Sequence, residues 1–576
     1  MKIASVSQVF SQIEETSSRT EITQMLAGLL VDATATEAKE LCYLFLGELY
    51  PPYKPSQYAI AQKMMLKIVG RALDVSEYEI QKKMARVGDV GSLVEQEEWD
   101  APVVDLSVSQ VYKELVALEV LSGTGSQEKK IEHMVALLRK LDQVSAKYVI
   151  RIVMGTLRLG FSDMTIIDAL SWMISGDKKA RGVIEQAYNV CADIGLMAYE
   201  LKNNGLSALE RMKIHIGVPV RPAAAERLPD CQAIIDKLGH CVAQPKLDGF
   251  RLQIHIDKSK SSHVECHFFS RNLIDISQMF PEFVEVCQKL KIKTLIADGE
   301  AMVYDPKTGH FLPFQETVKR RRKHGIEELV SSLPLQLHLF DILYLNGQDL
   351  LAYPHKERRA LLAEVLKECD DERIQLIDEK DIRAVDVLED YFVHEIESGL
   401  EGVIVKKIDA PYQAGKRNFN WIKLKYEASS KLEDTIDVVI LGYYQGKGKR
   451  AKMGIGAFLV GIFNPHSDQF ETVAKVGTGL SDIQWSELKK LCDKHAVAKQ
   501  PHNVMCSKVL VPSVWVDPVV VCEVLADNIT ISPVHSAGKT DKHLGVALRF
   551  PRFVRYRNDK SPEQTTTYKE LASMVG

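Results

Sequence analysis

The chain has 576 residues, 46% of them hydrophobic, and a formal net charge of −4. This length predicts roughly three or four domains, and the near-neutral charge means that any nucleic-acid binding must come from local basic patches. No segment is long and apolar enough to cross a membrane, and the N-terminus lacks the apolar run of a signal peptide, so we expect an intracellular, cytoplasmic protein. The ten cysteines form no Cys-x-x-Cys pair, which argues against a zinc knuckle and fits reduced thiols.

The first third of the chain has the apolar spacing of amphipathic helices. Hydrophobic residues fall on one helical face over 22–30, with Thr20 as a candidate N-cap, and again over 131–141 and 148–159. The Gly123–Ser126 loop before the second of these helices leaves backbone N–H groups free for a phosphate. The polar faces carry cations that are interpreted either as solvated surface or as phosphate contacts: Lys129, Lys130, Arg139, Lys140, Lys147, Arg151 and Arg158.

A domain boundary is predicted where helical spacing changes to strand alternation. Two prolines mark it within 217–222, which gives a helical domain over 1–216. From 217 to 430 strands and helices alternate. Within this region the basic run Arg320–Lys323 is interpreted either as a solvated helix face or as a phosphate contact.

The last region, 431–576, has short apolar alternations separated by glycine-rich turns. Val438–Gly442 and Ala457–Gly461 are two such strands, and the pattern is typical of a small barrel. The basic loop Gly446–Arg450 between them is either solvated or suited to a phosphate. Ala537–Thr540 looks like the end of a P-loop, but proline stands where the first glycine belongs, so a Walker NTPase is rejected.

One segment of the middle region places a lysine at the entrance of a strand. After Lys246, apolar and polar residues alternate over 250–257, which predicts a half-buried strand. Gly249 allows the backbone to bend sharply between the two. A lysine beside Asp248 and Arg251 is either a solvated surface residue or a nucleophile, and this segment alone does not decide between them.

Seven short motifs in a fixed order give this lysine a context. The segment Gln244–Arg251 contains Lys-x-Asp-Gly followed by arginine, the lysyl-nucleotidylation motif of DNA ligases, RNA ligases and mRNA capping enzymes. The others follow in order: Ser270-Arg271-Asn272, Asp298-Gly299-Glu300, Phe340–Tyr344, Glu401–Lys406, Trp421–Lys425 and Arg549–Arg552 with Asp559-Lys560 behind it. The whole chain resembles the ATP-dependent DNA ligases of the archaeal and eukaryotic replicative type.

This resemblance implies a multi-domain fold: an all-α DNA-binding domain, an α/β (ATP-grasp-like) nucleotidyltransferase domain and an all-β OB-fold domain. It implies an enzyme that joins 3′-hydroxyl and 5′-phosphate ends at nicks in DNA replication, repair and recombination, through a lysyl-AMP intermediate. The expected cofactors are ATP and Mg²⁺, and the expected partner is nicked double-stranded DNA. A sliding clamp is kept as a candidate partner, although no clamp-binding peptide is recognised. We expect a monomer, associated with the nucleoid in a prokaryote.

The resemblance also implies a role for each motif residue. Lys246 is the nucleophile, and Glu300 and Glu401 hold the divalent ion, with Glu300 also accepting from the ribose hydroxyls. Nearby cations would lower the pKa of Lys246, and Lys423 and Lys425 project to one face of a strand. The remaining nucleotide contacts are implied as follows: Gln244 and Phe340 at adenine, Arg251 and Arg271 at ribose or phosphate, Arg417 at the nucleotide, Lys423 at the α-phosphate, and Arg549, Arg552 and Lys560 at the leaving pyrophosphate.

Two of these residues have a structural alternative, and one departs from the family pattern. Phe340 lies among apolar neighbours and Glu300 at a strand end, so without the motif order they would be interpreted as core and surface. Ligases of this type commonly carry glutamate where Gln244 stands. The amide oxygen can accept from the adenine amino group, but an amide can also flip, which leaves the strictness for ATP over other nucleotides open.

Other protein classes share part of this pattern. A capping guanylyltransferase or an RNA ligase would lack the long helical region ahead of Lys246, and an NAD-dependent ligase would need a cysteine zinc site. A non-catalytic DNA clamp that had lost the chemistry is disfavoured by five intact residues: Lys246, Glu300, Glu401, Lys423 and Arg549.

Overall fold

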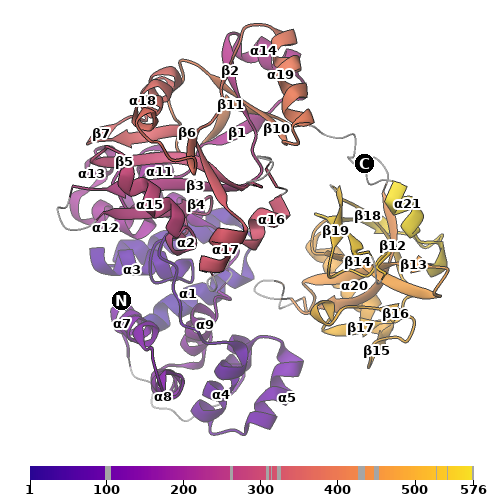
Figure 1. The fold of residues 1–576 in the computed structure, drawn as a ribbon. Helices are drawn as coiled ribbons and strands as arrows, with labels where there is room; N and C mark the ends of the chain where they lie inside the picture. Colours follow the sequence, from indigo (N-terminus) through magenta and orange to yellow (C-terminus); the bar gives the residue numbers. More distant parts are fainter. Residues whose placement is uncertain are drawn as a thin grey trace.

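The computed structural model describes residues 1–97, 105–157, 159–259, 264–305, 311–312, 314–320, 326–425, 435–446, 450, 453–526, 528–540 and 543–573. Figure 1 shows a helical N-terminal part, a mixed middle part packed against it, and a β-rich C-terminal part that stands beside both. Within the described residues, no helix has the length and hydrophobicity needed to span a bilayer.

Helices of the N-terminal part share one apolar core, built from side chains such as Phe10, Leu26 and Tyr148. The helices predicted from the spacing correspond to α2, α8 and α9, but the third ends at Val153 and does not continue to Leu159 as predicted. The predicted cap is wrong: Ser18 Oγ accepts from the backbone N–H of Glu21 at 3.3 Å, and Thr20 lies within the first turn. The helices are α1 (Ile3–Glu15), α2 (Arg19–Asp32), α3 (Ala35–Phe45), α4 (Gln62–Leu73), α5 (Glu77–Val87), α6 (Val90–Glu95), α7 (Val108–Val120), α8 (Ser126–Leu138), α9 (Gln143–Val153), α10 (Asp163–Ser175), α11 (Arg181–Val190), α12 (Ile194–Asn204) and α13 (Leu206–Glu210).

Several cations of this part are buried, which neither interpretation of the sequence expected. Lys147 and Arg151 lie on α9, which packs against α1 and α6, and both form ion pairs with Glu14. Lys130 is also buried and donates to the backbone carbonyl of Tyr58 at 2.6 Å. Arg158 lies outside the described residues. The cations that remain exposed are Lys129, Arg139 and Lys140.

Two sheets form the middle part. The first has the order β4-β3-β5-β6-β7, with β8 parallel to β6, and the second has the order β1-β11-β10-β2-β9. The chain leaves the second sheet at the end of β2 and enters the first at β3, so the loop between these strands lies where the sheets meet. The strands are β1 (Ala224–Arg227), β2 (Cys241–Pro245), β3 (Phe250–Asp257), β4 (Glu265–Ser270), β5 (Thr294–Val303), β6 (Leu335–Leu345), β7 (Gln348–Asp349), β8 (Ile374–Leu376), β9 (Lys380–Ile382), β10 (Gly402–Lys407) and β11 (Arg417–Lys425).

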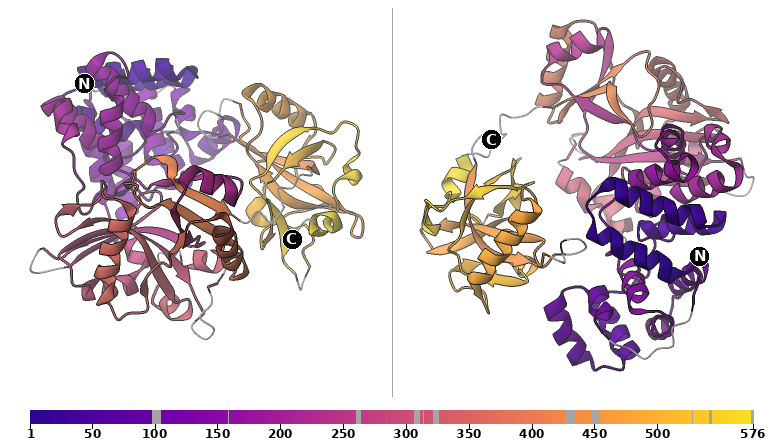
Figure 2. Two further views of the ribbon diagram at one scale, coloured as in Figure 1. Left: turned by 90° about the horizontal axis from the view of Figure 1, so that it is seen from above. Right: turned by 180° about the vertical axis from the view of Figure 1, so that it is seen from behind.

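Helices cover the outer faces of these sheets (Figure 1), and in the views of Figure 2 the N-terminal helices lie against the first sheet. The helices of the middle part are α14 (Cys231–Leu238), η1 (Ser277–Met279), α15 (Pro281–Lys289), α16 (Phe314–Lys319), α17 (Ile326–Ser332), α18 (His355–Lys367) and α19 (Val385–Glu397).

Strand β3 is buried on both faces, so the prediction of a half-buried strand is wrong. Its apolar face is in the core as expected, but Gln253 and His255 on the polar face are also buried. The proline-containing segment that marked the domain boundary covers them: Val220 N–H donates to Gln253 Oε1 at 2.7 Å, and Gly217 N–H donates to His255 Nδ1 at 3.1 Å. Burial lowers the pKa of His255 to about 3, so this imidazole is neutral and can accept.

The C-terminal part is built on one large sheet and a hairpin. The sheet has the order β15-β17-β12-β13-β14-β16, with β18 joining β12 to β21, while β19 and β20 pair with each other. The strands predicted at 438–442 and 457–461 are confirmed in β12 and β13. The elements are β12 (Ile436–Tyr444), β13 (Ala457–Asn464), β14 (Gln469–Val476), α20 (Asp482–Lys494), β15 (Ala496–Val497), β16 (Val504–Met505), η3 (Lys508–Leu510), β17 (Val514–Val516), β18 (Val521–Leu525), β19 (Asn528–Ser532), β20 (Gly545–Arg549), β21 (Arg552–Tyr556), η4 (Pro562–Gln564) and α21 (Tyr568–Ser573).

Two further expectations for this part can be compared with the structure. Ala537–Thr540 lies between β19 and β20, and the N–H of Gly538 donates to a carboxylate oxygen of Glu471 at 2.7 Å, so it is no phosphate loop. In the basic loop Gly446–Arg450, residues 447–449 lie outside the described residues. Arg450 donates to the carbonyls of Gly456 and Gly477, each at 2.9 Å.

The basic run that begins at Arg320 also differs from both interpretations. Arg320 is 2% exposed and forms an ion pair with Glu282 of α15, while 321–323 lie outside the described residues. It is therefore neither a solvated side chain nor a phosphate contact.

We predict that this buried pair stabilises the middle part. Replacing Arg320 with alanine leaves the Glu282 carboxylate buried without its partner, and we expect a loss of about 3–5 kcal/mol in the free energy of unfolding. Urea denaturation followed by circular dichroism measures it. Arg383→Ala is the control, because its ion pair with Asp381 is largely exposed. Equal losses in the two variants would contradict the prediction.

Candidate active site

A cavity of about 1570 Å³ opens where the two sheets of the middle part meet. The helical part contributes Tyr53 and Lys54 to its wall, and the C-terminal part contributes Arg549. The sequence-predicted residues that line it are Gln244, Lys246, Arg251, Arg271, Glu300, Phe340, Arg417, Lys423 and Arg549.

Three predicted residues are absent from this lining. Glu401 is still close, because its carboxylate pairs with the amine of Lys246. Arg552 and Lys560 belong to the C-terminal part, and Lys560 donates to Asp437 at 2.6 Å. Of the three residues predicted at the leaving pyrophosphate, Arg549 lines the cavity, whereas Arg552 and Lys560 do not.

Lys246 is held at the junction of the sheets by its own backbone. Its N–H donates to the carbonyl of Gly402 at 2.8 Å, and its carbonyl accepts from the N–H of Glu401 at 3.3 Å. Gly402 has a φ of 134°, and a Cβ there would collide with the carbonyl oxygen of Leu424, so the position requires glycine. The Lys246 side chain pairs with the Glu401 carboxylate, which also lies 2.9 Å from Nζ of Lys425.

Carboxylates surround this amine in different charge states. Burial raises the pKa of Glu300 to about 7, against the opposing charges of Lys246 and Arg251. Burial also raises the pKa of Asp248, helped by the charge of Glu401. For Glu401 itself burial raises the pKa, but Lys246 and Lys425 outweigh it and the net shift is downward. Glu401 is therefore an anion, whereas Glu300 changes charge near neutral pH.

A divalent cation fits this donor set only with ligands from the substrate. Within the described residues, no group of three His, Cys, Asp or Glu side chains could hold a metal ion. Glu300 and Glu401 offer hard carboxylate oxygens beside the cavity. Mg²⁺ is commonly held by one or two carboxylates, with water and phosphate oxygens completing its shell, so the residues present fit it.

Cations gather on the β11 side of the cavity. As the alternation predicted, Lys423 and Lys425 line the cavity while Ile422 and Leu424 are buried on the opposite face. Burial lowers the pKa of Lys423, and the charges of Arg417, Lys425, Arg271 and Lys246 lower it further. A polyanion entering here would relieve this mutual repulsion.

Another part of the cavity wall is aromatic. Phe340 lines it and meets Trp421 edge-on, with 6.0 Å between ring centroids, so it is a wall residue and not part of a closed core. Lys406 lies 4.3 Å above the Trp421 ring and donates to the Phe340 carbonyl at 3.0 Å. Burial lowers the pKa of Lys406 to about 8. No role in the site was predicted for Lys406 or Trp421 from the sequence. Both belong to quoted motifs, Glu401–Lys406 and Trp421–Lys425, and this membership is the signal that could have assigned them.

Arg251 has its guanidinium largely occupied within the protein. It donates to Asp298 at 2.8 Å and to the carbonyl of Ala223 at 2.9 Å. Its Nε is buried and has no partner among the described residues. Arg251 thus joins β3 to β5 beneath the cavity, and Nε is the atom left for a further contact.

Known proteins match this chain along nearly its whole length. Three family models match in succession: "DNA ligase N terminus" over 2–171, "ATP dependent DNA ligase domain" over 222–425 and "ATP dependent DNA ligase C terminal region" over 451–560. The chain is 41% identical to a probable DNA ligase of Dictyoglomus turgidum, covering 100% of this chain and 97% of the relative. It is 37% identical to DNA ligase 1 of Methanosarcina acetivorans, covering 100% and 99%. A solved structure named Pmar-Lig_PreS3 has the same fold, with a TM-score of 0.52, 18% identity and coverage of 96% of this chain and 99% of that chain.

We predict that the Glu300 carboxylate makes the fold less stable at high pH. Folding raises the pKa of Glu300 from the unfolded value near 4.5 to about 7, so the protonated carboxyl group stabilises the fold. This stabilisation is complete below pH 4.5 and is lost as the pH rises through 7. Glu300→Gln should therefore raise the free energy of unfolding by about 1–3 kcal/mol at pH 8 and change little at pH 4.5.

Urea denaturation at the two pH values measures the difference. Glu364→Gln, an exposed position on α18, is the matched control and should show no pH-dependent gain. A Glu300→Gln gain of equal size at both pH values would mean that the carboxyl does not titrate near neutrality.

Proposed function

The chain belongs to the ATP-dependent DNA ligases and seals nicks in DNA with ATP, and from this premise we propose that Lys246 is the side chain that carries AMP. The observation that supports it most is the backbone fixing of Lys246 at the meeting point of the two sheets, with its amine in the cavity. The relatives matched over nearly their full length are named DNA ligases, which disfavours the capping enzyme, RNA ligase and clamp alternatives.

The Lys246 amine must lose its proton before it can attack the α-phosphate. Lys425 shares the one Glu401 carboxylate with it, so two ammonium groups compete for one negative charge. Lys423 adds a third cation beside them. This surplus of positive charge attracts the phosphates, which suits an in-line displacement at an anionic centre.

The nucleotide is proposed to bind in the cavity with its base at the aromatic wall and its phosphates at the cations of β11. Gln244 and Phe340 would face adenine, and Glu300 the ribose hydroxyls. Mg²⁺, held by Glu300 and Glu401, would neutralise charge on the phosphate oxygens. The cations proposed for the ribose and phosphates are Arg251, through its free Nε, with Arg271, Arg417 and Lys423.

The three parts are proposed to act as the three domains of this family. Residues 1–216 would bind the phosphate backbone of duplex DNA, 217–430 would form an ATP-grasp-like adenylation domain, and 431–576 an OB-fold domain. The helices ending at Glu210 and the strand beginning at Ala224 support the first boundary. Arg549 supports a role for the third domain in the first step. Arg552 and Lys560 would need that domain to turn, and Lys560 would have to leave Asp437.

We predict that Lys246→Ala abolishes both the covalent AMP adduct and the sealing of unadenylated nicks, since no other amine replaces it. Lys246→Arg is the matched variant: it keeps the positive charge beside Glu401 but supplies no nucleophile, and it should be equally inactive. Intact-mass spectrometry after incubation with ATP and Mg²⁺ measures the adduct. An AMP mass increment on Lys246→Ala would remove Lys246 as the nucleophile.

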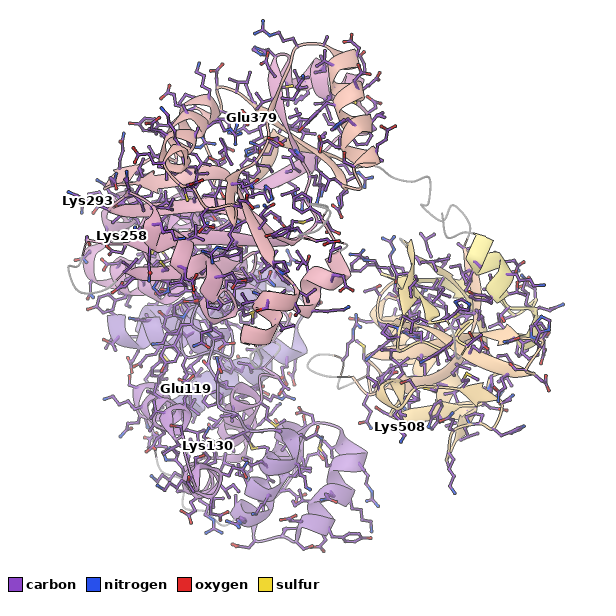
Figure 3. All side chains as sticks on the ribbon, in the orientation of Figure 1. Glu119, Lys130, Lys258, Lys293, Glu379 and Lys508 are labelled. Atoms are coloured by element: carbon purple, nitrogen blue, oxygen red, sulfur yellow. The ribbon has the colours of Figure 1, made fainter. Side chains whose placement is uncertain are left out.

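We predict that Arg549→Ala slows adenylation by about a hundredfold, the usual cost of losing one charged group at a reacting phosphate. Sealing of a pre-adenylated nick should fall much less, because no pyrophosphate leaves in that step. Lys508→Ala, also on the C-terminal part (labelled in Figure 3), is the control and should change neither rate. Equal losses in both steps would contradict the assignment to the first.

A further inference from the structure

A carboxylate stands behind the side chain proposed to read adenine. Nε2 of Gln244 donates to Oε2 of Glu379 at 2.7 Å, and Nε2 of His355 lies 2.8 Å from the same oxygen. Gln244 lines the cavity, whereas Glu379 is not among the lining residues. Figure 3 labels Glu379 within the middle part, far from the C-terminal part. Gln244 is therefore the cavity-lining side chain to which Glu379 is hydrogen-bonded.

The charge of Glu379 decides which end of the amide it accepts. Burial raises the pKa of this carboxyl, but the hydrogen bond and charge of His355, with the charges of Arg359 and Lys406, outweigh it and shift the pKa downward. An ionised carboxylate has no proton to donate. The Gln244 amide must then present its NH₂ group to Glu379, because a flipped amide would set its carbonyl oxygen against a negative oxygen.

The other end of the amide is consequently fixed as well. Gln244 lies in β2, directly opposite Ile404 of β10, and is 1% exposed, so the side chain has little room to rearrange. Among the residues that the structure describes, nothing donates to its Oε1. The cavity thus meets a carbonyl oxygen at this position, which is an acceptor and not a donor.

We propose that Glu379 is a positioning residue for base selection: it orients Gln244 so that the amide oxygen accepts from the 6-amino group of adenine and repels the 6-oxo group of other purines. This inference rests on the adenine role proposed for Gln244 above. It answers the open question of strictness left by the sequence, since the glutamine that replaces the usual glutamate cannot flip while Glu379 is charged. In the usual pattern the glutamate itself presents an acceptor to adenine, whereas here Gln244 presents it and Glu379 holds Gln244 in the required orientation.

Glu379→Gln tests the orientation with the smallest change of shape. The new amide can donate or accept, so Gln244 becomes free to turn either way. The probe is inosine triphosphate, which differs from ATP by carrying a 6-oxo group. We expect the ratio of kcat/KM for adenylation with ATP to that with inosine triphosphate to fall by about tenfold or more, the size of one charge-assisted hydrogen bond. An unchanged ratio would overturn the proposal.

Asp381→Asn is the matched control. It removes a carboxylate from the neighbouring strand β9, where Asp381 pairs with His240 and Arg383 at the surface and does not touch Gln244. It should leave the ratio as in the wild type. A fall equal to that of Glu379→Gln would mean that loss of charge in this region, and not the orientation of Gln244, sets the ratio.

A reciprocal exchange keeps the test decisive if Glu379→Gln folds poorly. In Gln244→Glu/Glu379→Gln the glutamine at 379 can donate to the glutamate at 244, whose second oxygen faces the cavity. The double variant should recover the ATP preference, whereas Gln244→Glu alone sets two carboxylates together and should adenylate less well. A double variant no more selective than Glu379→Gln would overturn the proposed positioning role of Glu379.

Gln244→Ala separates this inference from the function on which it rests. If Gln244→Ala leaves the ATP to inosine triphosphate ratio unchanged, adenine is not recognised by Gln244 and the proposed adenine site fails. If Gln244→Ala lowers the ratio but Glu379→Gln does not, Gln244 reads the base without help and only the positioning role of Glu379 is wrong.

Discussion

The pairing of the Lys246 backbone with the start of β10 is the constraint on which the site depends. Through it the loop between β2 and β3 is tied to both sheets at once, because β2 pairs with β10 and β3 pairs with β5. The backbone of Lys246 therefore cannot move without breaking the hydrogen bonds to the start of β10. Gly402 allows this close approach, since a side chain there would strike the neighbouring strand.

Around this fixed lysine the cavity brings together three kinds of side chain. Phe340 and Trp421 supply an aromatic wall, Glu300 and Glu401 supply carboxylates, and Lys423 and Lys425 supply cations. A nucleotide combines a flat base, a hydroxyl-bearing sugar and a charged tail. The match is one of chemical type, and it explains why a chain with near-neutral net charge can still bind a polyanion.

Sequence reasoning succeeded where the relevant neighbour was local and failed where it came from elsewhere in the chain. Lys423 and Lys425 were placed correctly because alternation along one strand fixes their face. The burial of Gln253 and His255 was missed because the covering segment, 217–220, carries no signal that it packs on a sheet. Arg320 and Lys147 looked like surface cations because their acidic partners are far away in sequence. Glu379 was missed for the same reason, since its sequence separation from Gln244 is 135 residues.

Lys425 is the last residue of β11, and it forms an ion pair with the Glu401 carboxylate, which also pairs with Lys246. The next strand along the chain, β12, already belongs to the C-terminal part. In chain order, the strand that brings Lys423 and Lys425 to the cavity is therefore the last strand of the middle part. Its final residue completes the second sheet and at the same time neutralises the carboxylate beside the proposed nucleophile.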